Sequence, residues 1–239
     1  MGKNLIQQRR GKASGIFRSR SFRFAGEIKL PGFKGETMVK GKIKDIINSV
    51  GHSSPLAVIQ YENNQISLFP APEGVRVGEE VEHGSEAQMK IGNVLPLEKI
   101  PEGTSIFNIE SNPGDGGKFV RSTGGFARVL ARTEAGIQIE FPSKARKILN
   151  PKCRAIIGIV AGGGRKEKPL MKAGNMYHKR RATNRRYPQV SGVAMNAVAH
   201  PHGGSSSAHK GRPTISGKFA PPGRKVGSIR PRRTGRRRK

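Results

Sequence analysis

The stretch "LAVIQYENNQISLFP" (residues 56–70) decides the fold class. Two short runs rich in apolar and β-branched residues, 56–61 and 66–70, flank the polar segment "ENNQ", which is typical of a hairpin turn. Similar runs occur at 38–47, 74–82, 104–110, 126–133, 137–142 and 154–160. The turn "EAG" joins the run 126–133 to the run 137–142. The sequence therefore predicts a mainly β protein.

The spacing of these runs predicts small barrels. Short strands that follow one another closely, with glycine and proline between them, are typical of antiparallel barrels. About 60 residues for each barrel gives two barrels, near the lower size at which a domain holds its own core. The strand pattern is lost in "HGSEAQMKIGN" (83–93), so we place the boundary near residues 83–95.

Charge divides the chain further. The 45 Lys and Arg residues and 16 Asp and Glu residues give a formal net charge of +29. Residues 1–35 carry +8 and residues 161–239 carry +20, whereas 36–100 carry −3 and 101–160 carry +4. Such an excess repels itself unless a polyanion neutralises it, which makes nucleic acid the leading partner.

The two basic arms have too few apolar residues to form a core. Residues 168–239 contain no Asp or Glu, and only 13 of these 72 residues are Val, Ile, Leu, Met, Phe or Tyr. Burial of so little apolar surface cannot offset the loss of chain entropy. We expect the arms to become ordered only where phosphates neutralise them.

Several other classes of protein are disfavoured. A basic membrane-surface protein needs an amphipathic helix or a lipidation signal, and Ile6 stands where the myristoylation pattern needs Ser or Thr. No apolar run approaches a membrane span or a signal peptide. The single Cys153 excludes an intramolecular disulfide and a cysteine-built zinc cluster. We expect no membrane partner, no small-molecule substrate, no cofactor and no metal.

The glycine-rich segment "NPGDGGKFVRSTGG" (112–125) resembles a phosphate-binding loop but lacks its spacing. Asn112 stands where the first glycine is required, and Phe119 follows the lysine where Ser or Thr is required. Two interpretations stay open. The backbone amides, with Lys118 and Arg121, contact RNA phosphates, or the segment is a surface loop between strands.

Aromatic and basic residues alternate in "AGGGRKEKPLMKAGNMYHKRRATNRRYP" (161–188). Tyr177, His178 and Tyr187 are interleaved with arginines. Rings can stack on nucleobases while guanidinium groups bind phosphates. With this charge density, the pattern indicates nucleic-acid binding rather than a solvated charge run.

The run "MNAVAHPHGGSSSAHKGRP" (195–213) contains His200, His202 and His209. Zinc would need further ligands, and a catalytic histidine would need a carboxylate, yet the nearest preceding acid is Glu167. The third interpretation is a glycine-rich turn that presents imidazoles to RNA. Because Pro201 favours extended geometry at His200, the two flanking imidazoles are predicted to point to opposite sides.

Several of these motifs together resemble one family. "GVAMNAVAHPHGG" (192–204), "APPGRKVG" (220–227) and "RRTGR" (232–236) are similar to the tail of the universal large-subunit ribosomal protein two family. "LFPAPEG" (68–74) and the compact "GDGGK" loop resemble its archaeal form.

The resemblance implies a domain plan and a role for the tail. It implies a basic N-terminal extension (1–35), an OB-like barrel (36–85), an SH3-like barrel (86–160) and a basic extension (161–239) that threads into rRNA. The histidine-containing tail would then reach toward the peptidyl transferase region, with His200 at the position of a histidine proposed to support peptide-bond formation. Ala199 replaces the polar residue that usually precedes it, which weakens a catalytic role.

The leading hypothesis is therefore a structural protein of the cytoplasmic ribosome, not an enzyme, with large-subunit rRNA, neighbouring ribosomal proteins and the small subunit as partners. The alternative is an RNA-acting enzyme that uses His200 as acid or base. The residues expected to contact RNA are basic side chains of both arms and the glycine-rich loop, together with the histidine turn: Arg9, Arg10, Lys12, Arg18, Arg20, Lys118, Arg121, Arg165, Lys172, His178, Lys179, Arg180, Arg181, Arg185, Arg186, Asn196, His200, His202, Gly203, Gly204, Arg212, Arg224, Lys225, Arg230, Arg232, Arg233 and Arg236.

Overall fold

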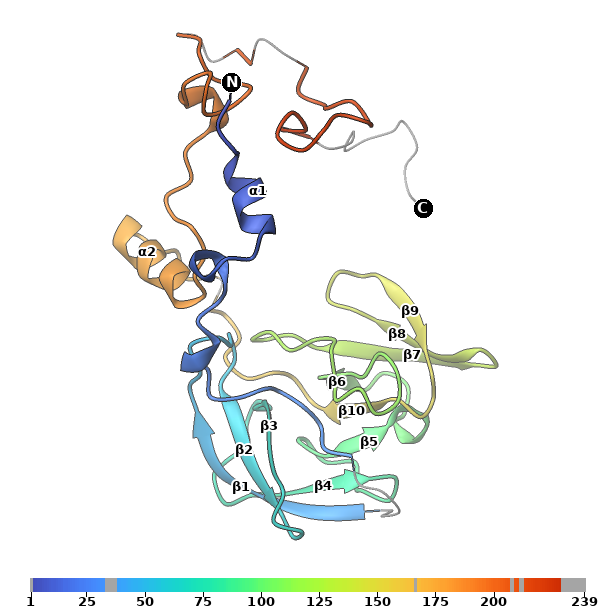
Figure 1. Ribbon diagram of the computed structural model, residues 1–239. Helices are drawn as coiled ribbons and strands as arrows, with labels where there is room; N and C mark the ends of the chain where they lie inside the picture. The colour runs from blue at the N-terminus through green and yellow to red at the C-terminus, as the bar shows by residue number, and fades with distance from the viewer. Residues whose placement is uncertain (1, 33–37, 166, 207–208, 211–212, 229–239) are drawn as a thin grey trace. The chain divides into compact units, whose positions relative to one another are not determined.

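The structure is a computed structural model that describes residues 2–32, 38–165, 167–206, 209–210 and 213–228 (Figure 1). The chain divides into two compact units. Residues 21–170 form the first, called the body here, and residues 1–20 with 171–239 form the second, called the basic module. All ten strands that the structure describes lie in the body, so the prediction of a mainly β fold is confirmed.

The ten strands form one sheet in the order β3-β2-β1-β4-β5-β10-β6-β7-β8-β9. Every neighbouring pair is antiparallel except β4 and β5. The strands have these bounds: β1 Met38–Ile47, β2 Leu56–Tyr61, β3 Ile66–Pro70, β4 Glu80–Gly84, β5 Val94–Pro96, β6 Ser105–Phe107, β7 Ala127–Thr133, β8 Gly136–Glu140, β9 Arg146–Leu149 and β10 Arg154–Ile157.

The hairpin that decided the fold class lies where the sequence predicts it. β2 and β3 pair from Leu56 opposite Pro70 to Gln60 opposite Ile66. Asn64, in the turn, has a φ of 61°, a left-handed conformation that asparagine tolerates better than most residues. The second predicted hairpin is also confirmed, because β7 and β8 pair up to Thr133 opposite Gly136.

The sheet encloses two hydrophobic cores and shares its middle strands between them. In β5, Val94 packs in the first core and Leu95 in the second; in β6, Ile106 packs in the second and Phe107 in the first. Such strands, buried on both faces, have apolar residues at successive positions rather than alternating ones. Two cores in one curled sheet agree with the expected small barrels.

Three expectations about the strands and boundaries need correction. The run 74–82 is not one strand, because the chain turns through Gly78 (φ 88°) and β4 begins at Glu80. β5 and β9 were not predicted. The body also begins at Ser21, earlier than residue 36, and Ile28 and Leu30 from the expected N-terminal extension pack in the first core.

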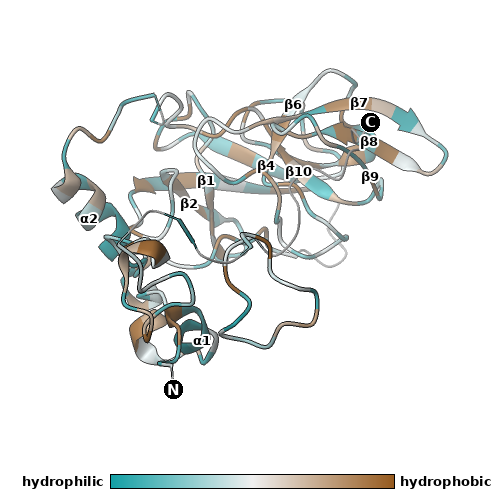
Figure 2. Ribbon diagram, turned by 90° about the horizontal axis from the view of Figure 1, so that it is seen from above, coloured by the Kyte–Doolittle hydropathy of each residue, from teal (hydrophilic) through white to brown (hydrophobic). Residues whose placement is uncertain are grey.

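The basic module contains short helices and turns. Its helices are α1 Ile6–Gly11, η1 Gly15–Phe17, α2 Ala173–Ala182 and η4 Gly192–Ala194, while the body has η2 Ser21–Arg23 and η3 Leu97–Lys99. Among the module's described residues, the buried ones are Leu5, His202 and Val226. Hydrophobic segments alternate with hydrophilic ones along the body's strands, whereas α2 ends in hydrophilic residues (Figure 2). Over the described residues, the helices are too short and too polar to cross a membrane.

Candidate nucleic-acid interface

The basic module gathers cations without any matching anion. Residues 1–20 and 171–239 contain 24 Lys and Arg residues and no Asp or Glu. An arginine here cannot form an ion pair with an acidic side chain of its own unit. The electrostatic free energy of this unit is therefore lowered only by an external anion.

Helix α2 shows how little the module depends on apolar packing. None of its residues is buried, and Lys172 at its N-cap makes no side-chain capping hydrogen bond. Lys179, Arg180 and Arg181 lie in the last turn, where positive charge interacts favourably with the helix dipole. A ten-residue helix without a buried face is marginal in water, so apolar packing contributes little to the stability of α2.

The structure brings cations from the two ends of the sequence onto one cavity of about 1030 Å³. Arg9, Arg10 and Arg20 come from the N-terminal segment. Four more arginines come from α2 and the residues that follow it: Arg180, Arg181, Arg185 and Arg186. These seven residues were all expected in the interface, but their convergence was not predicted.

Asn184 fastens the two segments of this cavity together. Its side-chain amide donates hydrogen bonds to the carbonyl oxygens of Ile16 (2.7 Å) and Arg18 (2.6 Å). Its φ of 51° turns the chain directly after α2. We call this space, between residues 6–20 and 177–189, the arginine cavity. Sequence reasoning missed Asn184, since nothing local marks a contact 168 residues away.

Other side chains of the arms that were expected to contact RNA lie outside the arginine cavity. Lys12, Lys172, His178 and Lys179 are exposed, and the His178 ring packs edge-on against Tyr177 at 5.5 Å between ring centroids. Arg18 is exposed, and its Nε donates to the carbonyl oxygen of Ala13 (2.9 Å). Arg165 is exposed at the end of the body.

The far end of the tail is more turned than expected. Pro221 and Pro222 predict an extended path for residues 218–239, of which 229–239 lie outside the described residues. Pro221–Arg224 instead forms a turn in which the Arg224 amide donates to the Pro221 carbonyl oxygen. Ile215 and Ser228 also form an isolated bridge, and Lys225 Nζ donates to the Lys218 carbonyl oxygen (3.1 Å). The remaining expected contacts lie outside the described residues: Arg212, Arg230, Arg232, Arg233 and Arg236.

The histidine run forms a tight turn built on glycine. The amides of Ala199 and His200 donate to the Asn196 carbonyl oxygen, and Gly204 donates to Met195. A Cβ at Gly203 would collide with the carbonyl oxygens of Met195 and Asn196, and Gly204 has a φ of 89°. Both positions therefore require glycine.

The imidazoles of this turn do not point to opposite sides, so that prediction is wrong. The rings of His200 and His202 meet edge to face with centroids 5.0 Å apart. The His202 amide donates to His200 Nδ1 (3.1 Å), and the Gly203 amide donates to the His200 carbonyl oxygen (2.9 Å), which closes a turn over Pro201 and His202. His202 is buried, whereas His200 lines a second cavity of the module, about 430 Å³.

The protonation state of His200 follows from these contacts. Burial, and then the neighbouring His202, lower the pKa of His200 below its usual value. Since Nδ1 accepts the His202 amide, the proton of the neutral ring lies on Nε2. His200 is thus arranged as a neutral Nε2–H donor. In the described part of the chain, no three His, Cys, Asp or Glu side chains gather as metal ligands would.

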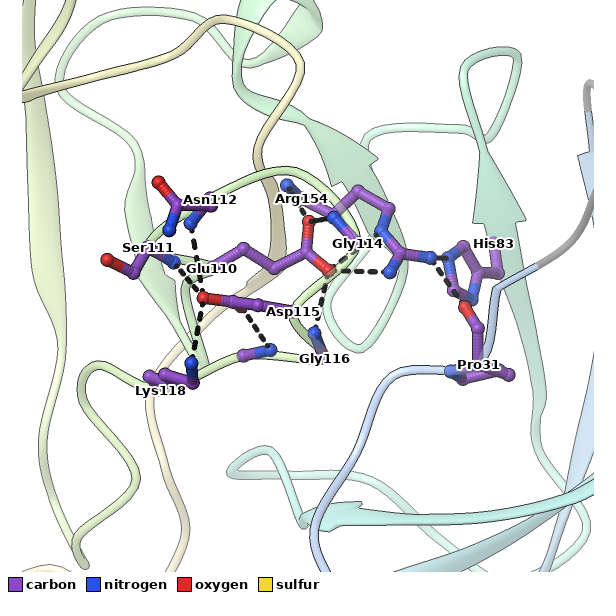
Figure 3. A network of polar contacts seen from close by, with 11 residues as sticks. Pro31, His83, Glu110, Ser111, Asn112, Gly114, Asp115, Gly116, Lys118 and Arg154 are labelled. Atoms are coloured by element: carbon purple, nitrogen blue, oxygen red, sulfur yellow. Dashed lines mark hydrogen bonds and ion pairs between the residues drawn. The ribbon is translucent and has the colours of Figure 1, made fainter.

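In the body, the glycine-rich loop is occupied by the protein's own carboxylates (Figure 3). The Asp115 carboxylate accepts hydrogen bonds from the backbone amides of Ser111 (3.0 Å), Asn112 (3.1 Å) and Gly117 (3.1 Å). The Glu110 carboxylate accepts hydrogen bonds from the amides of Gly114 (3.2 Å) and Gly116 (3.1 Å). The loop's amides therefore already have acceptors. This favours the surface-loop interpretation for the backbone between 111 and 117.

Charges beside this loop are balanced internally. Burial alone would raise the pKa of Asp115, but the amides it accepts and nearby Lys118 lower it. Lys118 lies 3.5 Å from Asp115, with 60% of its side chain exposed. The lysine therefore still presents its ammonium group to solvent.

A buried ion pair anchors the loop. Glu110 is fully buried and pairs with Arg154, whose Nε (3.1 Å) and backbone amide (2.9 Å) donate to it. Arg154 Nη1 contacts His83 Nε2 (3.0 Å) and donates to the Pro31 carbonyl oxygen. Burial and then Arg154 lower the pKa of His83 to about 3. Sequence reasoning missed this network, although Glu110 just before the glycine-rich segment and Asp115 within it were a usable signal.

Lys118 and Arg121 share a third cavity, of about 1180 Å³, within the body. His52 also lines it, and burial and then Arg121 lower the pKa of His52. Arg121 is exposed, and its Nη1 lies 3.5 Å from the Ile28 carbonyl oxygen. The two basic residues expected from the glycine-rich segment therefore face one hollow, through their side chains rather than through the loop amides.

A β body that holds its deepest charge in an internal ion pair, joined to a basic module without Asp or Glu, is typical of the class of proteins that bind polyanions. Comparison with known proteins agrees with it. The family model described as "Ribosomal Proteins L2, C-terminal domain" matches residues 90–221. The chain belongs to this family, that of the large ribosomal subunit protein uL2.

Relatives align over essentially the whole chain. Large ribosomal subunit protein uL2 of Methanothermobacter thermautotrophicus is 52% identical over 241 residues, covering 100% of both chains. The proteins of the same name from Methanosphaera stadtmanae (50%, 100% of both) and Nanoarchaeum equitans (48%, 99% of both) are similar. These sources confirm the archaeal type.

Proposed function

We propose that the protein is a structural constituent of the large ribosomal subunit and that its basic module binds rRNA directly. The observation that carries this proposal is the set of 24 Lys and Arg residues in a unit without Asp or Glu. A unit of this kind gains stability from phosphates, which are densely spaced along RNA. Its position would accordingly be within the cytoplasmic ribosome.

The body contributes a second, smaller RNA contact in this proposal. Lys118 and Arg121 line the same hollow, and the loop that carries Lys118 is held by Glu110 and Asp115. A preorganised loop loses little conformational entropy when it binds. The loop's carboxylates serve to fix the lysine rather than to repel RNA, since their oxygens accept the loop's own amides.

His200 places RNA and does not transfer protons in this proposal. Its ring is held by the His202 amide and lies on Gly192, where a Cβ would collide with it. A neutral Nε2–H can donate to a phosphate, sugar or base oxygen. The module contains no acidic side chain that could orient the ring for acid–base work. Contacts with neighbouring ribosomal proteins and with the small subunit complete the proposal.

Sedimentation tests this function. The tagged chain, produced in an archaeal cell, should co-migrate with large subunits on sucrose gradients and dissociate only at high salt, because counterion release dominates phosphate contacts. A chain that stays at the top of the gradient at low salt would contradict the proposal. So would turnover of a free RNA substrate by the purified chain alone.

A further inference from the structure

The arginine cavity has features that simple attraction to phosphates does not explain. Besides its arginines, it is lined by Phe17, Tyr177 and Tyr187. Tyr177 is 46% exposed, and the other two rings are partly buried. Exposed aromatic surface costs free energy in water, so rings at a cationic cavity are best stabilised by a flat, apolar group that reaches them.

Nucleobases are such groups, and they come attached to phosphates. Proteins that bind single-stranded RNA combine a cationic groove with rings on which bases stack. In an A-form duplex the bases are stacked on one another and paired, so they cannot reach a side-chain ring. The combination of guanidinium groups and rings therefore selects unpaired nucleotides over duplex.

The geometry of the cavity fits several nucleotides rather than one. Its volume of about 1030 Å³ lies at the upper end of the range for small-ligand pockets, roughly 300–1,000 Å³. Its arginines come from two chain segments that Asn184 joins through hydrogen bonds to Ile16 and Arg18. An RNA strand in the cavity would contact both segments at once.

We propose that the arginine cavity binds an unpaired RNA segment, a bulge or a loop, whose bases stack on Tyr177 and Tyr187 while its phosphates contact the arginines of both arms. This rests on the proposed function and deepens it, because it names the kind of RNA that this part of the module takes. Occupation by RNA also stabilises α2, which has no buried residue of its own.

The chain has a built-in probe for the test. It contains three tyrosines and no tryptophan, and Tyr61 is only 2% exposed in the body's core. A change in tyrosine fluorescence on adding a soluble oligonucleotide therefore reports on Tyr177 and Tyr187. Three probes are used with the full chain: single-stranded oligo(A) RNA, an abasic strand with the same number of phosphates, and a self-complementary duplex.

Oligo(A) should quench the tyrosine fluorescence, whereas the abasic strand and the duplex should bind with little quenching. Replacement of both rings, by Tyr177→Leu with Tyr187→Leu, should weaken oligo(A) binding about tenfold or more and change abasic binding less than about twofold. The matched control is Phe219→Leu, which removes a ring that is 89% exposed and outside the cavity. It should leave oligo(A) affinity within about twofold.

Three results would overturn the proposal. Equal losses of affinity for oligo(A) and for the abasic strand in the double tyrosine variant would mean that the cavity holds phosphates alone. An equal loss of oligo(A) affinity in the Phe219 variant and in the tyrosine variant would mean that aromatic rings anywhere on the module bind bases, without a defined site. Tighter binding of an oligoglutamate peptide than of oligo(A) would assign the cavity to an acidic protein segment.

Failure of this inference is distinguishable from failure of the proposed function. If the wild-type chain binds large-subunit rRNA with strong salt dependence but its tyrosines are not quenched, the function stands and the cavity proposal falls. If it does not bind large-subunit rRNA at all, the proposed function itself fails.

Discussion

The body and the basic module solve the problem of charge in opposite ways. The body has a net charge of +5 and pairs its deepest charge, Glu110, with Arg154 and two loop amides. The module has a net charge of +24 and no acidic side chain. The body is therefore stabilised by its own core and polar network. In the proposed function, the module is stabilised by the RNA that it binds.

Burial shows the same difference. Two clusters of fully buried aliphatic and aromatic residues fill the body, while the module buries Leu5, His202 and Val226 among its described residues. Net stability is a small difference between burial and chain entropy. If the module binds rRNA as proposed, a unit with so few buried side chains would gain structure mainly from that RNA, so folding and RNA binding would be coupled in the module and separate in the body.

The largest expected effect concerns the end of the tail. Deletion of residues 230–239 removes seven basic residues: Arg230, Arg232, Arg233, Arg236, Arg237, Arg238 and Lys239. If all contact phosphates, the slope of log affinity against log salt for an rRNA fragment spanning the binding site should flatten by about 5–6. Filter binding across a salt series measures it.

A body variant provides the control for that deletion. Lys40→Gln with Lys42→Gln removes two lysines that stand opposite Glu82 and Glu80 between β1 and β4. Its slope should stay close to that of wild type. Two results would remove the distinction between the two regions. One is an unchanged slope after the tail deletion, and the other is a slope that flattens as much per basic residue removed in the body variant as in the tail deletion.

The next effect is on the stability of the body. Glu110→Ala leaves the partly buried Arg154 without its counter-ion and removes the hydrogen-bond acceptor of the Gly114 and Gly116 amides. The free energy of unfolding should therefore fall by about 3–5 kcal/mol. Urea denaturation followed by circular dichroism measures this. Glu140→Ala breaks a 4.0 Å pair with the exposed Arg146 and should cost about 0–1 kcal/mol. Similar losses in both variants would contradict the assigned role of Glu110.

A pH effect of intermediate size should come from His83. Its pKa is about 3 in the folded body and about 6.5 unfolded, so the unfolded chain binds a proton first as pH falls. Its contribution to stability is fully present above pH 6.5 and declines below it, by about 1.4 kcal/mol for each pH unit. Urea titrations between pH 7 and 5 should show this decline. His83→Gln should flatten it, and an unaltered pH dependence would refute the prediction.

The smallest expected effect is on peptide-bond formation. His200→Gln keeps hydrogen bonding but removes a base, and large subunits that carry it should form peptide bonds within a few-fold of wild type once assembly is normalised. General acid–base catalysis typically contributes about 100- to 10,000-fold. A loss of that size in fully assembled subunits would restore the alternative in which His200 is catalytic.

The strands that sequence could predict are those with a clear period. β1, β2 and β3 alternate or fill one short apolar run, and asparagines mark the hairpin turn, so their bounds match the prediction. β5 ends in Pro96, and β9 begins with two exposed basic residues, so neither has a strand signature. In 74–82, Val75 and Val77 have the two-residue spacing of a strand, but the chain turns at Gly78 (φ 88°), so the run is not one strand.

The sequence predicted which residues belong to the candidate site, but not which of them meet in space. Basic residues, rings and glycines of the tail were identified from local pattern. The contact of Asn184 with Ile16 and Arg18 depends on residues more than 160 positions apart, for which one sequence has no signal. The contact between His200 and His202 was mispredicted because Pro201 and His202 lie in a turn, closed by the hydrogen bond from the Gly203 amide to the His200 carbonyl oxygen, rather than in an extended segment.

Hydrogen exchange of the full chain, alone and bound to large-subunit rRNA, tests the central claim most directly. We predict that amides of the body's strands are protected in both states, whereas amides of α2 and of residues 195–204 exchange rapidly in the free chain and become protected on RNA. Strong protection of α2 and the histidine turn without RNA would contradict the account, because the module would then be stable without its partner.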